Sequence, residues 1–103
     1  MPLQRVRGVR VRVGERWADL RVDRRSVLDH EPPGPAVALP GTRLGPGRWE
    51  AGPVSGIPPE IDERSSYEVE IAAADGRCWR SRAAFSLLPP SARLLGQAAL
   101  EPC

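Results

Sequence analysis

The sequence predicts an all-β fold, either a small barrel or a compact antiparallel sandwich with an extra N-terminal hairpin, built as a single domain over residues 1–103. Two stretches alternate apolar and charged residues with the period of a half-buried strand. Helical periodicity is nearly absent. The prolines and glycines concentrate between residues 32 and 59, and strand-like segments lie on both sides. Short strands separated by Pro/Gly turns are typical of such domains.

The N-terminal hairpin is expected over residues 4–23. Valines alternate with arginines along residues 9–13, and the alternation resumes after Gly14-Glu15, a pair that suits a type II′ turn. The predicted cross-strand pairs are Val11 with Ala18, Val9 with Leu20, Arg10 with Asp19 and Arg12 with Trp17. The phase of the alternation changes at Arg7-Gly8. This change predicts a bulge, after which Val6 faces Val22 and Arg5 faces Asp23.

A second hairpin is expected over residues 66–87. A three-residue loop, Ala74-Asp75-Gly76, with Gly76 in the left-handed conformation keeps the apolar residues on one face. The resulting pairs are Tyr67 with Ala83, Glu68 with Arg82, Val69 with Ser81, Glu70 with Arg80 and Ile71 with Trp79. A two-residue turn would instead bring Ile71 to Arg80, so pattern, turn chemistry and charge select one register.

The barrel-like part of the domain is expected over residues 36–95. The segments between the hairpins are assigned in order: a short strand at 36–39, a turn at 45–47, a short strand at 48–54 and a surface loop at 56–59. Pro89-Pro90 ends the last long strand. Residues 91–101 then form a short tail or a helix, because Ser91 can cap a helix with Leu94, Leu95 and Ala98 on one face.

The stretch from about residue 39 to residue 95 resembles a Tudor-type, SH3-like barrel. Its matching features are the aromatic strand start in RWEAGPV, then the central strand, Asp-Gly turn, return strand and Leu-Pro turn in YEVEIAAADGRCWRSRAAFSLLPPSARLL. The resemblance implies a small barrel, and in that family an aromatic cage holds a methylated Lys or Arg. Trp49 stands at one cage position. Ala73 and Ala74 stand at two others, so the implied cage is incomplete.

Composition restricts the possible partners and the compartment. All 15 basic residues are arginines, but 13 acidic residues reduce the net charge to +2, which is too balanced to imply a polyanion partner. No apolar run approaches the roughly 20 residues that cross a bilayer. Residues 1–13 lack the apolar stretch of a secretory signal. We therefore expect a cytoplasmic protein in which Cys78 and Cys103 are free thiols.

The sequence contains no pattern typical of an enzyme, and we expect neither catalysis, nor a cofactor, nor a metal. His30 is a candidate general base, but a loop histidine before the prolines is the better interpretation. Neighbouring arginines could activate Cys78, although a small residue at a strand edge is the simpler interpretation. The acidic group Glu60, Asp62 and Glu63 lacks the spacing of a calcium loop and is expected to be solvated.

The candidate binding residues are two tryptophans and three arginines of the first strand: Trp17, Trp49, Arg7, Arg10 and Arg12. Tryptophan and arginine are the residue types that most often anchor partners. The favoured function is a non-catalytic binding or assembly module that contacts another protein or a second copy of itself, with the first strand as a sheet edge for strand addition. The alternative is a small barrel that binds nucleic acid through its surface arginines. Neither involves a membrane.

Overall fold

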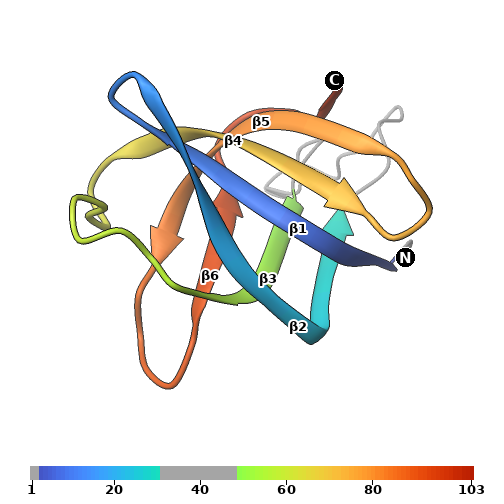
Figure 1. The fold of residues 1–103 in the computed structure, drawn as a ribbon, viewed down its shortest axis with the longest axis horizontal. Helices are drawn as coiled ribbons and strands as arrows, with labels where there is room; N and C mark the ends of the chain where they lie inside the picture. Colours follow the sequence, from blue (N-terminus) through green and yellow to red (C-terminus); the bar gives the residue numbers. More distant parts are fainter. Residues whose placement is uncertain (1–2, 31–48) are drawn as a thin grey trace, which may run out of the picture.

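The computed structural model describes residues 3–30 and 49–103, which form seven strands. They are β1 (Leu3–Val13), β2 (Arg16–His30), β3 (Trp49–Ser55), β4 (Ser66–Ala73), β5 (Cys78–Ser86), β6 (Ala92–Gly96) and β7 (Glu101–Pro102). Antiparallel pairing in the order β4-β1-β2-β3-β6-β5, completed by β4 with β5, closes six strands into a small barrel (Figure 1). The two-residue β7 lies outside the barrel on β5. The predicted all-β barrel is confirmed, and the N-terminal hairpin is part of its wall.

The β4–β5 hairpin has the predicted register at every pair, from Tyr67 opposite Ala83 to Ile71 opposite Trp79. The backbone N–H of Ala73 donates to the carbonyl oxygen of Arg77 at 2.8 Å, which leaves the predicted three-residue loop between them. Gly76 has a φ of 93°, a conformation that an L side chain adopts only with strain. The sequence-based choice of a three-residue loop is therefore confirmed.

The predicted register of the first hairpin is confirmed near its turn, but it is wrong further from the turn. Val9 lies opposite Leu20 and Val11 opposite Ala18, and Gly14 has the positive φ of the predicted turn, 64°. Beyond Val9, however, Arg5 lies opposite Val27, where Asp23 was expected. Between these two pairs β1 advances by four residues while β2 advances by seven. The extra residues therefore lie in β2, which continues to His30 instead of ending near residue 23.

Side chains within β2 hold this irregularity in place. An Asp23 carboxylate oxygen accepts the backbone N–H of Arg25 at 2.8 Å. The Ser26 hydroxyl accepts the backbone N–H of Asp23 at 3.0 Å and donates to the carbonyl oxygen of Pro53 at 2.6 Å. Ser26 is only 1% exposed, and its hydroxyl satisfies one backbone group of β2 and one of β3 where the pairing of β2 with its neighbours is interrupted.

The predicted bulge at Arg7-Gly8 exists, but it is a bulge against β4. Val6 lies opposite Ala73 and Gly8 opposite Ala72, so Arg7 is the extra residue. Since β1 pairs with β2 on one side and with β4 on the other, it is not an edge strand. Strand addition at β1, which the sequence favoured, is therefore excluded in the closed barrel.

The helix considered for residues 91–101 does not form. Ala92 and Leu94 are buried while Arg93 and Leu95 point outward, which is the two-residue period of a strand. The segment becomes β6, paired with both β3 and β5. The neighbouring strands supply its backbone hydrogen bonds, so tertiary pairing overrides the weak helical pattern.

Of the other segments predicted from the sequence, two are confirmed, one is corrected and two lie outside the described residues. The strand predicted at 48–54 is β3, and residues 56–59 lie outside any strand, as expected of the loop. His30, expected in a loop, is instead the last residue of β2. The strand at 36–39 and the turn at 45–47 fall outside the described residues. The described part of the chain contains no helix with the length and apolar character that would span a membrane.

Inward-facing side chains fill the barrel with aliphatic and aromatic groups. Val11, Val69 and Ile71 are fully buried, and the rings of Tyr67 and Phe85 meet edge to face with centroids 5.9 Å apart. Other buried members of this core are Val6, Val9, Leu20, Leu28, Trp49, Ala51, Val54, Ile61, Ala83, Ala92 and Leu94. Each buried aliphatic side chain contributes about 1.5–3 kcal/mol relative to exposure, so this core is the main source of stability.

We predict that alanine is destabilising at Gly96 and nearly neutral at Gly8. A Cβ on Gly96 would lie 2.5 Å from the ring of Trp49, which is buried and hydrogen-bonded, whereas a Cβ on Gly8 would meet nothing within 4 Å. Gly96→Ala is expected to lower the free energy of unfolding by about 1–3 kcal/mol through overpacking. Gly8→Ala, the matched control, is expected to change it by less than about 1 kcal/mol. Urea unfolding of both variants tests this, and equal effects would contradict the close contact at Gly96.

Candidate binding face

Outward side chains of β2, β1, β4 and β5 form one continuous surface, called here the outer face. Cross-strand pairing aligns a row of alternating charge across it: Asp19, Arg10, Glu70, Arg80 and, on β7, Glu101. The Arg10–Asp19 and Glu70–Arg80 pairs follow from the predicted hairpins. Their alignment into one row depends on the β1–β4 pairing, which joins residues about sixty positions apart.

Glu70 is the central member of this row. One of its carboxylate oxygens accepts Nε and a terminal nitrogen of Arg10 at 2.9 and 2.8 Å, and the other accepts the same two groups of Arg80 at 2.9 and 2.8 Å. The Glu70 side chain is only 12% exposed, so solvent screens these contacts less than usual. The paired guanidinium groups are therefore held in fixed positions.

Trp17 lies on the same face and is half-buried. The structure confirms that its backbone lies opposite Arg12, but the guanidinium over its ring belongs to Arg10, 4.9 Å from the ring centroid. Such a cation–π contact contributes about 0.5–1 kcal/mol at an exposed site. Arg12 instead approaches Glu68, with a nitrogen–oxygen distance of 3.6 Å. Trp17, Arg10 and Glu70 thus form a chain of contacts in which each group orients the next.

A hollow of about 320 Å³ opens beside this chain of contacts. Its lining residues are Gly8, Val9, Arg10, Asp19, Leu20, Glu70, Ala72 and Cys78. Gly8 contributes to its open space, because a Cβ there would meet nothing within 4 Å. We call it the Gly8 hollow. The sequence indicated that Gly8 is at a bulge, but it did not indicate that Cys78 and Glu70 lie beside it.

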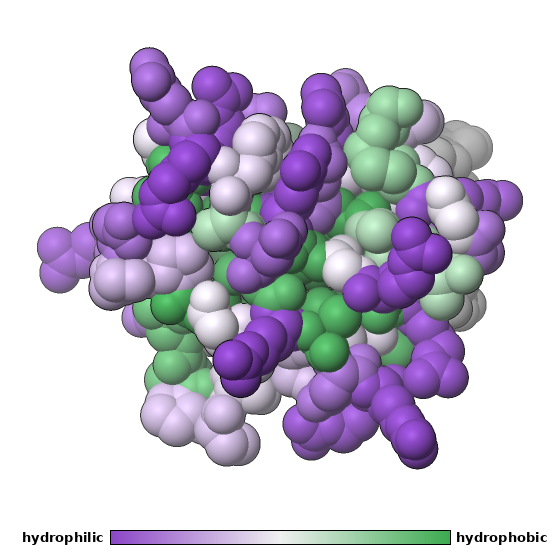
Figure 2. Space-filling model, viewed as in Figure 1, coloured by the Kyte–Doolittle hydropathy of each residue, from purple (hydrophilic) through white to green (hydrophobic). Residues whose placement is uncertain are grey.

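The five candidate residues are not all brought together. Arg10, Arg12 and Trp17 share the outer face, and Arg7 is the exposed bulge residue next to Gly8. Arg7 forms no ion pair with any residue in the described ranges. Figure 2 shows apolar surface in the middle of the view used for Figure 1, bordered by hydrophilic side chains.

Trp49 is the candidate that the structure places elsewhere. It is only 3% exposed, and its Nε1 donates to the carbonyl oxygen of Ala98 at 2.8 Å and to the Ser81 hydroxyl at 3.2 Å. A ring enclosed in this way offers no face to a partner. Trp49 is a core residue, and this also removes the cage position that the Tudor-type resemblance implied.

The cysteines form a disulfide, so the expectation of free thiols is wrong. The Cα atoms of Cys78 and Cys103 are 5.4 Å apart, and the backbone N–H of Cys103 donates to the carbonyl oxygen of Cys78 at 3.1 Å. The pairing of β7 with β5 brings the two together across 25 residues. No local pattern in the sequence indicates that the last residue folds back in this way.

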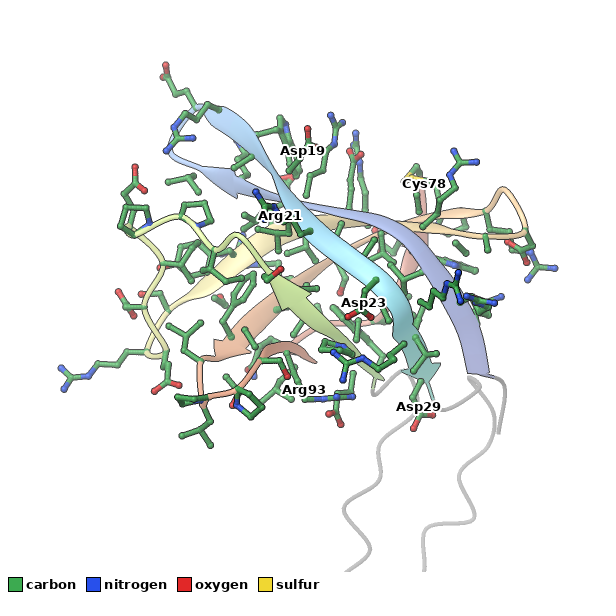
Figure 3. The ribbon with its side chains drawn as sticks, turned by 60° about the horizontal axis from the view of Figure 1, so that its bottom comes forward. Asp19, Arg21, Asp23, Asp29, Cys78 and Arg93 are labelled. Carbon is green, nitrogen blue, oxygen red and sulfur yellow. A yellow bond between two sulfur atoms is a disulfide. The ribbon has the colours of Figure 1, made fainter. Side chains whose placement is uncertain are left out.

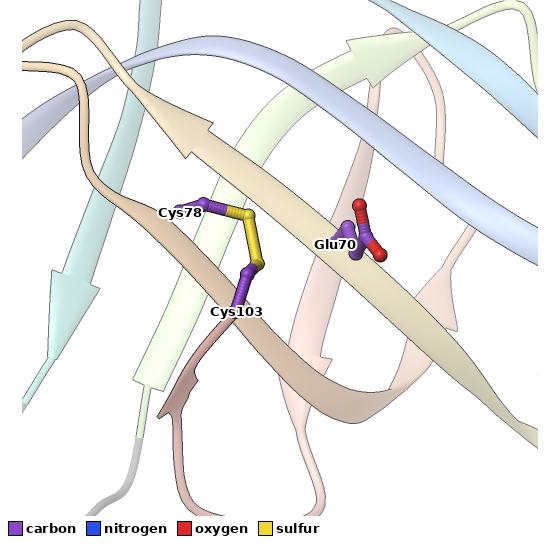
Figure 4. A group of neighbouring side chains, drawn as sticks. All are labelled: Glu70, Cys78 and Cys103. Atoms are coloured by element: carbon purple, nitrogen blue, oxygen red, sulfur yellow. A yellow bond between two sulfur atoms is a disulfide. The ribbon is translucent and has the colours of Figure 1, made fainter.

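Glu70 lies next to the disulfide (Figure 4), and its carboxylate oxygen and the two sulfur atoms lie within 4.8 Å of one another. Two sulfurs and a carboxylate could ligate a thiophilic cation. Here the sulfurs are bonded to each other, and both carboxylate oxygens accept arginine donors. In this oxidised state the group has no free ligand to offer a metal.

A second groove, of about 280 Å³, lies along β2 and β3. Its lining residues are Arg21, Val22, Asp23, Arg25, Pro53, Val54, Ser55, Pro90 and Ser91. Figure 3 shows Asp19, Arg21 and Asp23 following one another along β2. Hydrogen bonds from the Arg25 side chain and backbone hold the pKa of Asp23 below its ordinary value. These contacts serve the irregularity in β2, so we assign Asp23 a structural role.

The carboxylates of the acidic loop before β4 also make contacts within the protein. Glu60 forms an ion pair with Arg16 at 2.7 Å, and its pKa is lowered by hydrogen bonds from the backbone and from Arg16. Asp62 accepts the backbone N–H groups of Arg64 and Ser65 at 2.8 and 3.0 Å. These carboxylates stabilise the loop conformation and are not arranged around a common point.

No protein-family model, curated protein or solved structure matches this chain. The fold and the outer face are therefore interpreted from the chain's own residues.

We predict that the Asp23 carboxyl titrates below its ordinary pKa and that Arg25→Gln moves the midpoint back toward that value. The folded state favours the carboxylate. The stabilisation is thus complete above the unfolded-state pKa and is lost as the pH falls through the folded-state pKa. Carboxyl NMR titration of both proteins measures this. An unchanged midpoint in Arg25→Gln would show that the Arg25 side chain does not cause the shift.

Proposed function

We propose that the protein is a non-catalytic binding module that contacts another protein through the outer face, with Trp17 and the rim of the Gly8 hollow at the centre of the contact. The observation that supports this most directly is the chain of contacts that orients the Trp17 ring. Glu70 holds Arg10 by two hydrogen bonds, and the Arg10 guanidinium lies over the Trp17 ring. An aromatic anchor beside a hollow is a common arrangement at the centre of protein interfaces.

Rigidity is the second supporting argument. Association costs about 0.5–1.5 kcal/mol for each flexible side chain that it immobilises. Trp17 and Arg10 are already restrained by their mutual contact, and Arg10 is further restrained by Glu70. A partner that covers them therefore loses less entropy than it would on free side chains. Because β1 has neighbours on both sides, the contact uses side chains instead of strand addition at β1.

The nucleic-acid alternative has weaker support. Arg10 and Arg80 share Glu70, and Arg12 approaches Glu68, so carboxylates offset the charge of these arginines. A phosphate would have to compete with bonds that already exist. Arg7 is the candidate arginine that retains its charge without an acidic partner in the described part of the chain. Among the three candidate arginines, a single one without an acidic partner supplies little positive charge for binding a polyanion.

The protein-binding proposal is tested by comparing what the immobilised protein and its Trp17→Ala variant retain from a lysate of the source cells. Loss of a central aromatic anchor typically costs 2 kcal/mol or more, so we expect the specific partner to be depleted by about thirtyfold. Leu88→Ala is the control, because Leu88 is 70% exposed and lies outside the outer face. Sedimentation of the purified proteins reports self-association in the same way. Equal retention and equal mass for wild type and Trp17→Ala would overturn the proposal.

Nucleic-acid binding is tested separately with single-stranded DNA on filters at low salt. Because Arg10 and Arg12 already face carboxylates, we expect weak retention that Arg10→Ala and Arg12→Ala change little. Tight retention that falls steeply with salt and is lost in both variants would favour the alternative function.

A further inference from the structure

The two ends of the disulfide differ in how firmly the protein holds them. Cys78 is the first residue of β5, a strand that pairs with β4 at seven consecutive positions. Cys103 follows β7, whose two residues pair only with Trp79 and Arg80. Its own backbone makes one bond to β5, from its N–H to the carbonyl oxygen of Cys78 at 3.1 Å. Cleavage of the S–S bond would leave Cys78 in place and would allow Cys103 to move away.

The surroundings of the sulfurs make this difference chemically important. The Glu70 carboxylate lies within 4.8 Å of both sulfur atoms. A thiolate formed on Cys78 would remain beside that negative charge, although Arg10 and Arg80 offset part of it. A thiolate formed on the exposed Cys103 can move away with the short β7 and become hydrated. In thiol–disulfide exchange the more stable leaving thiolate departs faster. Cys103 is therefore the better leaving group.

Access to Cys78 comes from the Gly8 hollow, whose wall includes this residue. Gly8 lines the hollow and leaves open space where a side chain would otherwise stand. The hollow of about 320 Å³ has room for a small thiol or for a cysteine side chain. Which sulfur a thiol attacks depends on access as well as on the leaving group. Cys103 is the more exposed of the two residues, so the leaving group selects Cys78 and the hollow supplies a path to it.

We propose that the Cys78–Cys103 disulfide is an exchange site for thiols that enter the Gly8 hollow. The incoming thiolate attacks Sγ of Cys78, a new S–S bond forms between them, and the Cys78–Cys103 bond breaks with its electron pair going to Sγ of Cys103. The incoming sulfur is oxidised to the disulfide level while Cys103 is reduced to a thiolate, so no other oxidant is needed. The product is a mixed disulfide on Cys78 and a free thiolate on Cys103, which is no longer tied to β5 by a covalent bond.

This inference goes beyond the proposed binding function, because it concerns the chemistry of the hollow's wall and requires no protein partner. The barrel survives the exchange, since β7 lies outside it and the β4–β5 pairing does not involve Cys103. The class of substrate is a thiol, either a small molecule or a cysteine of another protein. Glutathione is the probe used in the test below, and it reports the chemistry for both sources.

The test is incubation of the folded protein with reduced glutathione, followed by acid quenching and mass spectrometry of the tryptic peptides. Arginines at positions 77 and 80 place Cys78 on a short peptide of its own, separate from Cys103. We expect the glutathione adduct mainly on Cys78, with Cys103 as the free thiol. An adduct mainly on Cys103, or no adduct until the protein is unfolded in urea, would overturn the proposal.

A hollow-filling variant tests the route of entry. Gly8→Leu is expected to slow formation of the Cys78 adduct by about tenfold because access controls the rate of attack. Ala99→Leu adds similar apolar bulk at an exposed position outside the hollow and is expected to leave the rate unchanged. Gly8→Ala is a milder variant that still folds, because its Cβ meets nothing within 4 Å. It should give a smaller slowing in the same direction. Equal rates in the wild type and both Gly8 variants would overturn the proposal.

Glu70→Gln tests the leaving-group argument. Removal of the carboxylate charge should make Cys78 a better leaving group, so the ratio of Cys78 adduct to Cys103 adduct should fall at least about threefold. An unchanged ratio would show that Glu70 does not direct the attack. The binding proposal is judged by Trp17→Ala, a variant that leaves Gly8, Glu70 and both cysteines intact. The two proposals can therefore fail independently.

Discussion

The pairing of β1 with β4 is the interaction on which the rest of the structure depends. It joins two hairpins that each form locally, and it places Val9 beside Ile71 and Val11 beside Val69 in the core. On the outside the same pairing brings Arg10 to Glu70 and Gly8 to Ala72. A strand has two faces, so one register sets the packing inside the barrel and the charge pairing outside it.

The outer face concentrates features that arise from three separate pairings. The first hairpin supplies Trp17 and Arg10, the β4–β5 hairpin supplies Glu70 and Cys78, and β7 brings Cys103 to the edge. None of these groups is unusual alone. Together they place Arg10, Glu70 and the disulfide-bonded Cys78 on the wall of the Gly8 hollow, with Trp17 in contact with Arg10. This is why both proposals concern this part of the molecule.

Local patterns predicted the hairpins well because a hairpin's register depends on its turn and on the alternation beside it. Gly14 and Gly76 have the positive φ values that their turns require, and every predicted β4–β5 pair is present. Prediction failed where distant strands decided the outcome. Ser26 bonds to Pro53 and stabilises the irregularity in β2, and residues 92–96 form a strand because β3 and β5 supply its partners.

The same distinction applies to the candidate site. The sequence identified Arg10, Arg12 and Trp17 as outward-facing, because alternation assigns each residue of a strand to one face. It could not identify Trp49 as buried or Cys78 as bonded to Cys103, because both depend on a C-terminal segment that returns to the barrel. By itself the sequence determined the strand class, two turns and the inward or outward direction of the alternating side chains beside those turns. Tertiary structure alone decided which strands became neighbours, because closing a barrel requires contacts between residues far apart in the chain, and short-range periodicity carries no information about them.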